Sequence, residues 1–294
     1  MSKQNCHRKE CTRIRSEFSV FLSRRRPPHY EGNIFCSDAC LQMQFENTLV
    51  EKWQRLQTEK VRRIPRPKLG TILMQTAFIT RSQLDEAIKL QNQAQEGRIG
   101  EWLQRLGFVE EHQITAALAR QYGLPLINLN TADANAEAVR MIPGKVARCS
   151  GLVPVGFDDD QMSLRVAVTA PVNFGSQEAI RRMVGKGIVP YVGDPSAIQK
   201  MLEKLYEPED LDLSDLPTFS SLEDLIEVGN DIIATAINHQ AQNIRAELAQ
   251  DFFWVRLDLP TKSHHHLFRY LAAPAGTCEQ VPEKGMAVGY GTGH

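Results

Sequence analysis

The sequence of 294 residues predicts a multidomain α+β fold, and three observations indicate it. A helical pattern occurs twice in succession, at a fixed spacing of thirty residues. Behind it, helical and strand-like segments alternate as they do in a small α+β domain. Four of the six cysteines lie within the first forty residues, in two close pairs. We therefore expect a small zinc finger, a tandem helical-hairpin repeat followed by a small α+β domain, and a further short α+β segment.

Composition and charge set broad limits. The chain has 42% apolar residues, enough for two or three ordinary cores, and a formal net charge of −1. Residues 1–70 hold 15 basic against 7 acidic side chains, and the remainder holds 19 against 28. Such a basic segment is either a solvated surface or an arm that meets an acidic partner or nucleic acid. Neither a secretory signal nor a run of about 20 apolar residues occurs, so we expect a cytoplasmic protein without membrane insertion.

The first segment, residues 1–62, is expected to be zinc-finger-like and to contain a helix. Its cysteine pairs have the spacings C-x4-C and C-x3-C, with 24 residues between them. In a cytosolic chain, where thiols stay reduced, such pairs are typical of a structural zinc site. Four thiolates satisfy the tetrahedral preference of zinc and leave no open position for catalysis. The predicted metal ligands are Cys6, Cys11, Cys36 and Cys40.

The surroundings of the second cysteine pair support this interpretation. The run 35–40, Phe-Cys-Ser-Asp-Ala-Cys, resembles treble-clef zinc fingers in which such a pair opens a helix. Ser37 can cap this helix, which extends towards Lys60. Because so short a segment buries little apolar surface, zinc would supply on the order of 10 kcal/mol of apparent binding free energy. His7 is an alternative ligand to Cys6, and four unrelated thiols are the alternative to a metal site.

The tandem repeat occupies residues 64–129 and predicts a short helix, a turn and a longer helix in each copy. The first copy runs over residues 68–91, the second follows thirty residues later, and both end on a glutamine. Gly107 allows a tight reversal in the second copy. In the first copy, Thr80 and Gln83 predict a capping box for the longer helix.

Residues 130–207 are expected to form the small α+β domain. The expected elements are a helix near 136–149, strands over 152–157 and 162–168 joined by a polar turn, a helix over 176–184, a strand over 188–192 and a helix that starts after Asp194. Residues 207–221 are acidic and turn-rich, and are expected to be a linker.

The last segment, residues 222–271, is expected to contain an amphipathic helix and then a strand over 253–259. Three adjacent histidines, 264–266, are expected in an exposed loop, because such close neighbours cannot converge well on one metal ion. Residues 272–294 are rich in glycine, alanine and proline without periodicity, and we expect them to be disordered.

The repeat resembles the amino-terminal MshEN domain of GspE/PilB-type secretion and pilus ATPases. That family carries two tandem copies of the pattern R-L-G-x-x-(L)-(L)-x-x-G-(L)-(L)-x4-L-x3-L-x2-Q. The second copy fits it from Arg98 to Gln121, whereas the first has Lys68 in place of the arginine and Ala77 in place of the second glycine. The continuation over residues 121–206 is also similar, so the resemblance covers about half of the chain.

The resemblance implies that the two copies bind cyclic di-GMP. The candidate ligand-binding residues are Lys68, Leu69, Gly70 and Gln91 in the first copy, and Arg98, Ile99, Gly100 and Gln121 in the second. Their chemistry suits a twofold-symmetric ligand with guanines and phosphates. Arginine can stack on a base or pair with guanine O6 and N7, glycine lets backbone amides approach a phosphate, and glutamine offers a donor and an acceptor. Lys68 lacks the planar fork of arginine, and Ala77 is costly if the turn needs a positive φ.

The function expected from the sequence is non-catalytic. The phosphate-binding motif G-x4-G-K-[ST] of the family's motor domain does not occur, and residues 222–271 resemble a truncated start of the domain before it. No acid/base pair or nucleophile pattern indicates an enzyme. We expect a cytosolic regulatory or adaptor protein, with a partner in pilus or secretion machinery or another protein. The alternatives are a ligand-free interaction scaffold, favoured by Lys68 and Ala77, and a zinc-finger nucleic-acid-binding protein with the basic stretch Arg24–Arg26, for which no base-reading helix is found.

Overall fold

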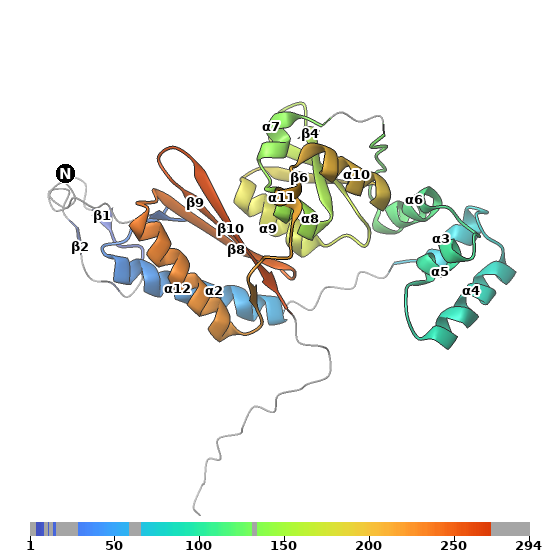
Figure 1. The fold of residues 1–294 in the computed structure, drawn as a ribbon, viewed down its shortest axis with the longest axis horizontal. Coiled ribbons are helices and arrows are strands. Elements are labelled where there is room, and N and C mark those ends of the chain that lie inside the picture. Colours follow the sequence, from blue (N-terminus) through green and yellow to red (C-terminus); the bar gives the residue numbers. More distant parts are fainter. Residues whose placement is uncertain are drawn as a thin grey trace, which may run out of the picture.

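The computed structural model of the protein describes residues 4–8, 11, 14–15, 29–58, 66–130 and 134–271. Its buried apolar residues form three hydrophobic clusters. We name the corresponding parts the repeat module (residues 66–122), the central unit (residues 123–216) and the paired unit (residues 29–58 with 218–271). The central unit lies between the other two along the long axis of the molecule (Figure 1). The protein is thus a multidomain α+β fold, as predicted.

Four helices form the repeat module, namely α3 (Leu69–Gln75), α4 (Arg81–Ala94), α5 (Ile99–Arg105) and α6 (Glu111–Tyr122). The predicted succession of a short helix, a turn and a longer helix is confirmed in both copies. The capping box is confirmed as well, because Thr80 and Gln83 each accept a hydrogen bond from the other's backbone N–H. The turn residues Ala77 and Gly107 hold equivalent positions, with φ of 57° and 71°.

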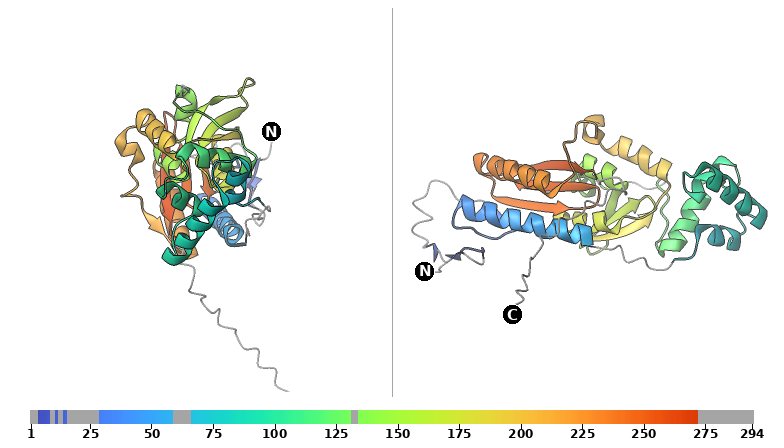
Figure 2. Two further views of the ribbon diagram at one scale, coloured as in Figure 1. Left: turned by 90° about the vertical axis from the view of Figure 1, so that its right-hand side faces the viewer. Right: turned by 90° about the horizontal axis from the view of Figure 1, so that it is seen from below.

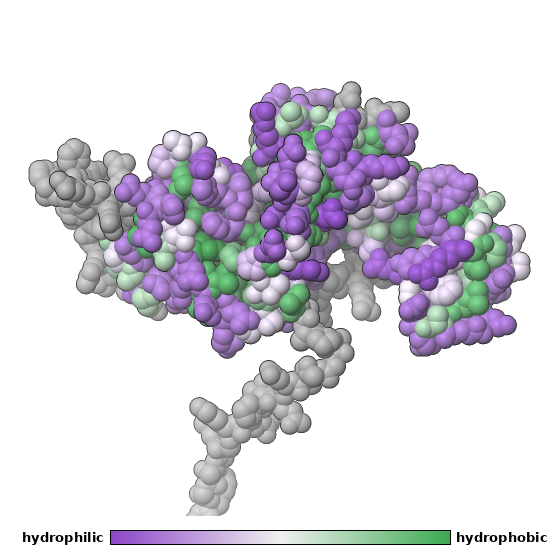
Figure 3. All heavy atoms as spheres, in the orientation of Figure 1, coloured by the Kyte–Doolittle hydropathy of each residue, from purple (hydrophilic) through white to green (hydrophobic). Residues whose placement is uncertain are grey.

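The two copies of the repeat pack crosswise, since α3 contacts α6 and α4 contacts α5. Glycine at the start of each short helix allows close packing, within the first copy at Gly70 and between the copies at Gly100. A Cβ on Gly70 would come within 2.7 Å of Leu84 Cδ1, and a Cβ on Gly100 would lie 3.3 Å from Leu69 Cδ2. On the face seen in Figure 3, apolar residues of the repeat module form a strip flanked by hydrophilic residues.

A three-stranded sheet with surrounding helices forms the central unit. Its strands are β4 (Leu152–Phe157), β5 (Ser163–Val168) and β6 (Gly187–Val192), and its helices are α7 (Ala136–Arg140), α8 (Gly144–Ser150), α9 (Phe174–Val184), α10 (Pro195–Leu205) and α11 (Pro208–Leu211). The sheet order is β4-β5-β6, antiparallel for the first pair and parallel for the second. The predicted hairpin and the two later helices are confirmed.

Two expectations for the central unit were wrong. The single helix expected near 136–149 is broken into α7 and α8, because Pro143 has no N–H to continue the first helix and instead precedes the second. The expected linker over 207–221 begins with α11, and Leu211 and Leu216 are buried in the hydrophobic cluster of the central unit. Acidic residues lie between these two leucines, so the sequence pattern is that of a polar linker and does not indicate that the leucines are buried.

The paired unit is a five-stranded sheet with two helices. Its strands are β3 (His29–Tyr30), β7 (Thr218–Phe219), β8 (Asn243–Leu248), β9 (Phe252–Asp258) and β10 (Ser263–Tyr270), and its helices are α2 (Asp38–Thr58) and α12 (Leu222–Asn238). The sheet order is β3-β8-β9-β10-β7. Both helices share one hydrophobic cluster with one face of the sheet. The two short strands β1 (Gln4–Asn5) and β2 (Ile14–Arg15) pair separately.

Parts of the chain that were expected as separate segments, residues 1–62 and 222–271, meet in the paired unit. β3 pairs in parallel with β8, and α2 contacts α12. The blue helix α2 and the orange helix α12 are both visible in the right-hand view of Figure 2. Gly229 of α12 lies so close to α2 that a Cβ there would be 2.6 Å from Leu49 Cδ1. Contacts between segments so far apart in sequence leave no periodic signal, which is why the sequence did not indicate them.

The opposite face of the sheet joins the paired unit to the central unit. Phe252, Trp254 and Leu267 are buried in the hydrophobic cluster of the central unit. Next to them, the buried Glu247 accepts a hydrogen bond from Lys52 of α2 at 2.8 Å and lies 3.5 Å from Arg182 of α9. The carboxylate therefore links helices of both units.

The three adjacent histidines were wrongly expected in a loop. Residues 264–266 belong to β10 and pair with residues 255–257 of β9. Polar side chains in a row resemble a turn in sequence, but cross-strand pairing with an apolar neighbour strand overrides this local preference.

Several sequence expectations fall on residues outside the described ranges: the disordered tail over 272–294, the basic stretch Arg24–Arg26, and the end of the first segment near Lys60. Within the described ranges, none of the helices is both long enough and apolar enough to span a membrane.

Candidate functional site

A cavity of about 380 Å³ lies between the repeat module and the central unit. One wall consists of α5, α6 and Leu69 of α3, and the other consists of Ala170–Pro171 and the turn between β6 and α10. Its volume is within the range of small-molecule sites. Five of the predicted ligand-binding residues line it together: Leu69, Arg98, Ile99, Gly100 and Gln121.

The other three predicted ligand-binding residues do not line this cavity. Lys68 is exposed directly before Leu69, and Gly70 is buried against Leu84. Gln91 uses its side-chain N–H to donate to the carbonyl oxygen of Gly97 at 2.9 Å. The two copies therefore contribute unequally, with the second copy supplying most of the wall.

The glutamines that end the two copies make matching hydrogen bonds. Gln91 Nε2 binds the carbonyl of Gly97, the residue before Arg98, and Gln121 Nε2 binds the carbonyl of Pro67, the residue before Lys68, at 2.6 Å. Each glutamine thus holds the start of the other copy's short helix. This reciprocal bond explains why the repeat ends on glutamine without reference to a ligand.

Charged groups of both signs surround the cavity. Arg98 is exposed, and none of the ion pairs in the described part of the chain involves its guanidinium. The Glu101 carboxylate accepts the backbone N–H of Arg98 at 3.2 Å. The Glu111 carboxylate accepts both the backbone N–H of Ser196, at 3.3 Å, and its hydroxyl. Among the residues that line the cavity, Arg98 is the one with a cationic side chain, so it is the group that can pair with an anionic ligand.

Glu111 connects the two walls of the cavity. It comes from the first turn of α6, and Ser196 lies at the start of α10, where the helix dipole favours a carboxylate. Beside this contact, Ile127 donates to the carbonyl of Val192 and Val192 donates to that of Pro125, at 3.0 and 2.8 Å. The sequence did not single out Glu111. The only signal was a departure from the repeat, since the equivalent residue of the first copy is Arg81.

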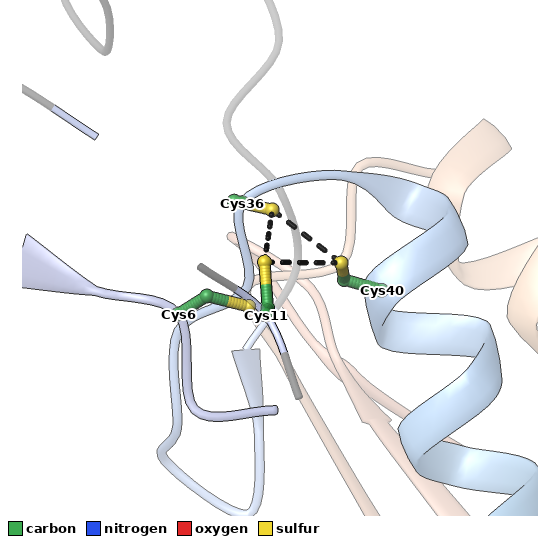
Figure 4. Close-up of side chains that lie close together, drawn as sticks. All are labelled: Cys6, Cys11, Cys36 and Cys40. Carbon is green, nitrogen blue, oxygen red and sulfur yellow. Dashed lines mark hydrogen bonds between the residues drawn. The ribbon is translucent and has the colours of Figure 1, made fainter. Parts of the chain in front are cut away.

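A second candidate site is the cysteine cluster near the amino-terminal end of the described chain. The four sulfur atoms of Cys6, Cys11, Cys36 and Cys40 lie within 4.8 Å of one another. Figure 4 shows the side chains pointing inwards from the first loop and from the start of α2. Sγ–Sγ distances are 3.5 Å for Cys11–Cys36, 3.4 Å for Cys36–Cys40 and 3.8 Å for Cys40–Cys11.

The cluster is held by the elements that the sequence predicted for it. Ser37 Oγ accepts the backbone N–H of Cys40 at 3.3 Å, which confirms the expected cap of α2. Burial, together with hydrogen bonds to Cys40 and Cys11, raises the pKa of the Cys36 thiol to about 12. His7 instead places its ring edge-on to Phe35, at 6.3 Å between centroids.

The central unit is similar to a known domain family. The family profile described as the MshEN domain matches residues 122–211. Residues 122–211 are thus similar to this domain family. The match starts at Tyr122, the last residue of α6, so it covers the central unit, including the far wall of the cavity, and leaves most of the repeat module and the cysteine cluster outside.

The relatives that the chain matches are longer proteins. It is 30% identical over 191 residues to the type IV pilus assembly ATPase PilB of Myxococcus xanthus, which covers 65% of this chain and 32% of that protein. The type IV pilus assembly ATPase PilB of Thermus thermophilus is 24% identical over 158 residues, 54% of this chain and 18% of the relative. The chain thus spans about a third or less of the curated relatives that it matches.

Among solved structures, one described as the structure of MshE with cdg resembles part of the chain. It is 27% identical in sequence, and the likeness covers 48% of this chain and all of that one, with a TM-score of 0.42.

Proposed function

We propose that the cavity between the repeat module and the central unit binds cyclic di-GMP, and that the chain is a regulatory or adaptor component of pilus or secretion machinery without catalysis of its own. The PilB relatives are pilus assembly ATPases, which motivates the choice of machinery. Because the chain spans only part of their length, their ATPase activity is not carried over to it.

The observation that carries this proposal is the convergence of Leu69, Arg98, Ile99, Gly100 and Gln121 on one cavity. In our proposal the guanidinium of Arg98 meets a phosphate or the O6/N7 edge of a guanine, both of which arginine binds well. Leu69, Ile99 and Ile114 cover the flat face of a base. Gln121 donates one side-chain N–H to the carbonyl oxygen of Pro67. The amide oxygen of the Gln121 side chain is then an acceptor for guanine N–H groups.

The unequal copies favour one ligand for each chain. In the first copy, Arg81 takes the place of Glu111 and forms an ion pair with Asp85 at 3.0 Å. Lys68 carries a charge but lacks the fork of arginine. We therefore expect the second copy and the central unit to supply the main contacts, and the first copy to supply Leu69.

Isothermal titration of the full chain with cyclic di-GMP tests the proposal. We expect one ligand per chain, and we expect Arg98→Ala to weaken binding roughly tenfold to a hundredfold, the cost of a lost charged hydrogen bond. Arg105→Ala is the matched control, because this arginine ends α5, the helix that Arg98 precedes, and its guanidinium lies over the ring of Trp102, outside the cavity. Lys68→Ala should change the affinity by less than about threefold.

Two results would contradict the proposal. The first is a folded wild-type protein that gives no heat with the ligand at tens of micromolar. The second is an equal loss of affinity in Arg98→Ala and Arg105→Ala.

If the folded protein gives no heat with the ligand, the alternative function, a ligand-free interaction scaffold, becomes the better account. It is favoured by Ala77, which holds a positive φ where the family pattern has glycine, and by Lys68, which lies outside the cavity wall.

A further inference from the structure

We propose that Cys6, Cys11, Cys36 and Cys40 hold one Zn²⁺ ion, and that this ion fastens the amino-terminal loop to the core that the two ends of the chain share. The metal would thus stabilise the paired unit as a whole, including α12 and β8 from the far end of the sequence. This inference is independent of the proposed cyclic di-GMP site.

The spacing of the sulfur atoms fits the ion. Four sulfurs arranged tetrahedrally around zinc, with Zn–S of about 2.3 Å, lie about 3.8 Å apart. The observed Sγ–Sγ distances of 3.4, 3.5 and 3.8 Å, and the upper limit of 4.8 Å for the whole set, are close to this value. Soft thiolates favour zinc over the hard cations magnesium and calcium.

The charge around the cluster also fits. Four thiols that bind one Zn²⁺ release four protons, and the centre then carries a net charge of −2. Arg8 lies in the same loop, between Cys6 and Cys11. Its Nε is buried without a hydrogen-bond partner among the described residues, and its Nη1 contacts the sulfur of Met43 on α2. The guanidinium of Arg8 thus places a positive charge in the loop that carries Cys6 and Cys11, and this charge opposes the net negative charge of a zinc–thiolate centre.

The four cysteines contact the hydrophobic cluster of the paired unit, so a metal bound to them would stabilise that whole unit. Cys36 and Cys40 belong to the hydrophobic cluster of the paired unit, and Cys6 and Cys11 pack against it. The same cluster contains Phe45 of α2, Ile233 of α12 and Phe253 of β9. Just before the second cysteine pair, β3 adds to the sheet beside β8, and Gly32 donates its N–H to the Asn243 side chain at 3.1 Å. Loss of the metal should therefore loosen elements from both ends of the chain.

The test combines metal content with hydrogen exchange on the full chain. Elemental analysis of protein purified without chelators should find roughly one zinc per chain in the wild type and in the control variant Cys149→Ser. Cys149 lies in the central unit, outside the cluster. Cys11→Ser should lower the zinc content roughly tenfold or more. Cobalt added to metal-depleted wild type should give the visible bands of a tetrahedral thiolate site.

Hydrogen exchange then tests the wider role. Removal of zinc from the wild type should speed exchange in α2, α12 and β8, while β5 and α9 of the central unit change little. The proposal is overturned if the folded wild type holds no zinc and yields no cobalt–thiolate bands. It is also overturned if zinc is present but its removal leaves α12 and β8 as protected as before. Both results come from the wild type, so a variant that fails to fold does not affect the decision.

Discussion

At the scale of single residues, the turns of the two copies differ by one methyl group, because Ala77 in the first copy takes the place of Gly107 in the second. Both follow a short helix and hold a left-handed conformation, with φ of 57° and 71°. Glycine adopts this region freely, whereas an L-residue with a Cβ pays a conformational cost there. A Cβ on Gly107 would meet no atom within 4 Å, so the difference between the two turns lies in the backbone and not in crowding.

Replacing Ala77 by glycine should therefore stabilise the repeat module. We expect the variant Ala77→Gly to raise the local free energy of unfolding of α3 and α4 by roughly 0.5–1 kcal/mol. Native-state hydrogen exchange of the amides in these helices measures it. Ala94→Gly, at an exposed helical position of α4, is the control and should lower the stability. An equal loss in both variants would show that the turn does not prefer glycine.

At the scale of elements, β10 combines with β9 to place a histidine beside a tryptophan. Trp254 Nε1 donates to Nδ1 of His265 at 3.1 Å, and the ring centroids are 5.7 Å apart. Partial burial of the imidazole, with the nearby guanidinium of Arg256 as a second cause, lowers the pKa of His265 to about 4. The neutral ring is the form that can accept the indole N–H.

This lowered pKa predicts how the paired unit responds to acid. Because the unfolded histidine has a pKa near 6.5, the unfolded state binds a proton first, and the folded state loses stability as the pH falls from about 6.5 to about 4. His265→Gln removes this titration but keeps an acceptor for Trp254, so its stability should fall less over the same range. Urea unfolding at several pH values measures the difference. The exposed His112→Gln is the control, and a wild-type slope in His265→Gln would contradict the assignment.

The sequence predicted the elements more completely than their contacts. The helices of the repeat, the hairpin of the central unit and the cap at Ser37 follow from local periodicity and capping residues, and they are present. The strand that contains the three histidines and the buried leucines of the expected linker could not be predicted locally, because their neighbours in space decide their structure. At the cavity, the motif indicated Arg98 and Gln121, whereas Glu111 is explained only by Ser196, which lies far from it in sequence.

On the scale of the whole molecule, the two candidate sites lie at joints between parts of the chain. The cavity lies where the repeat module meets the central unit, and the cysteine cluster lies where the two ends of the chain share one core. The buried Glu247, between Lys52 and Arg182, links the paired unit to the central unit. A ligand in the cavity would contact both the repeat module and the central unit. It would therefore change the stability of the contact between them, and a regulatory module requires such a ligand-dependent contact.

The most direct test of this account is hydrogen exchange of the full chain with and without cyclic di-GMP. We predict slower exchange on both walls of the cavity at once, in α5 and the start of α6 and in the turn over 192–196, with little change in the turn at Ala77 of the first copy. Unchanged exchange on both walls at saturating ligand, or protection confined to the first copy, would contradict the account.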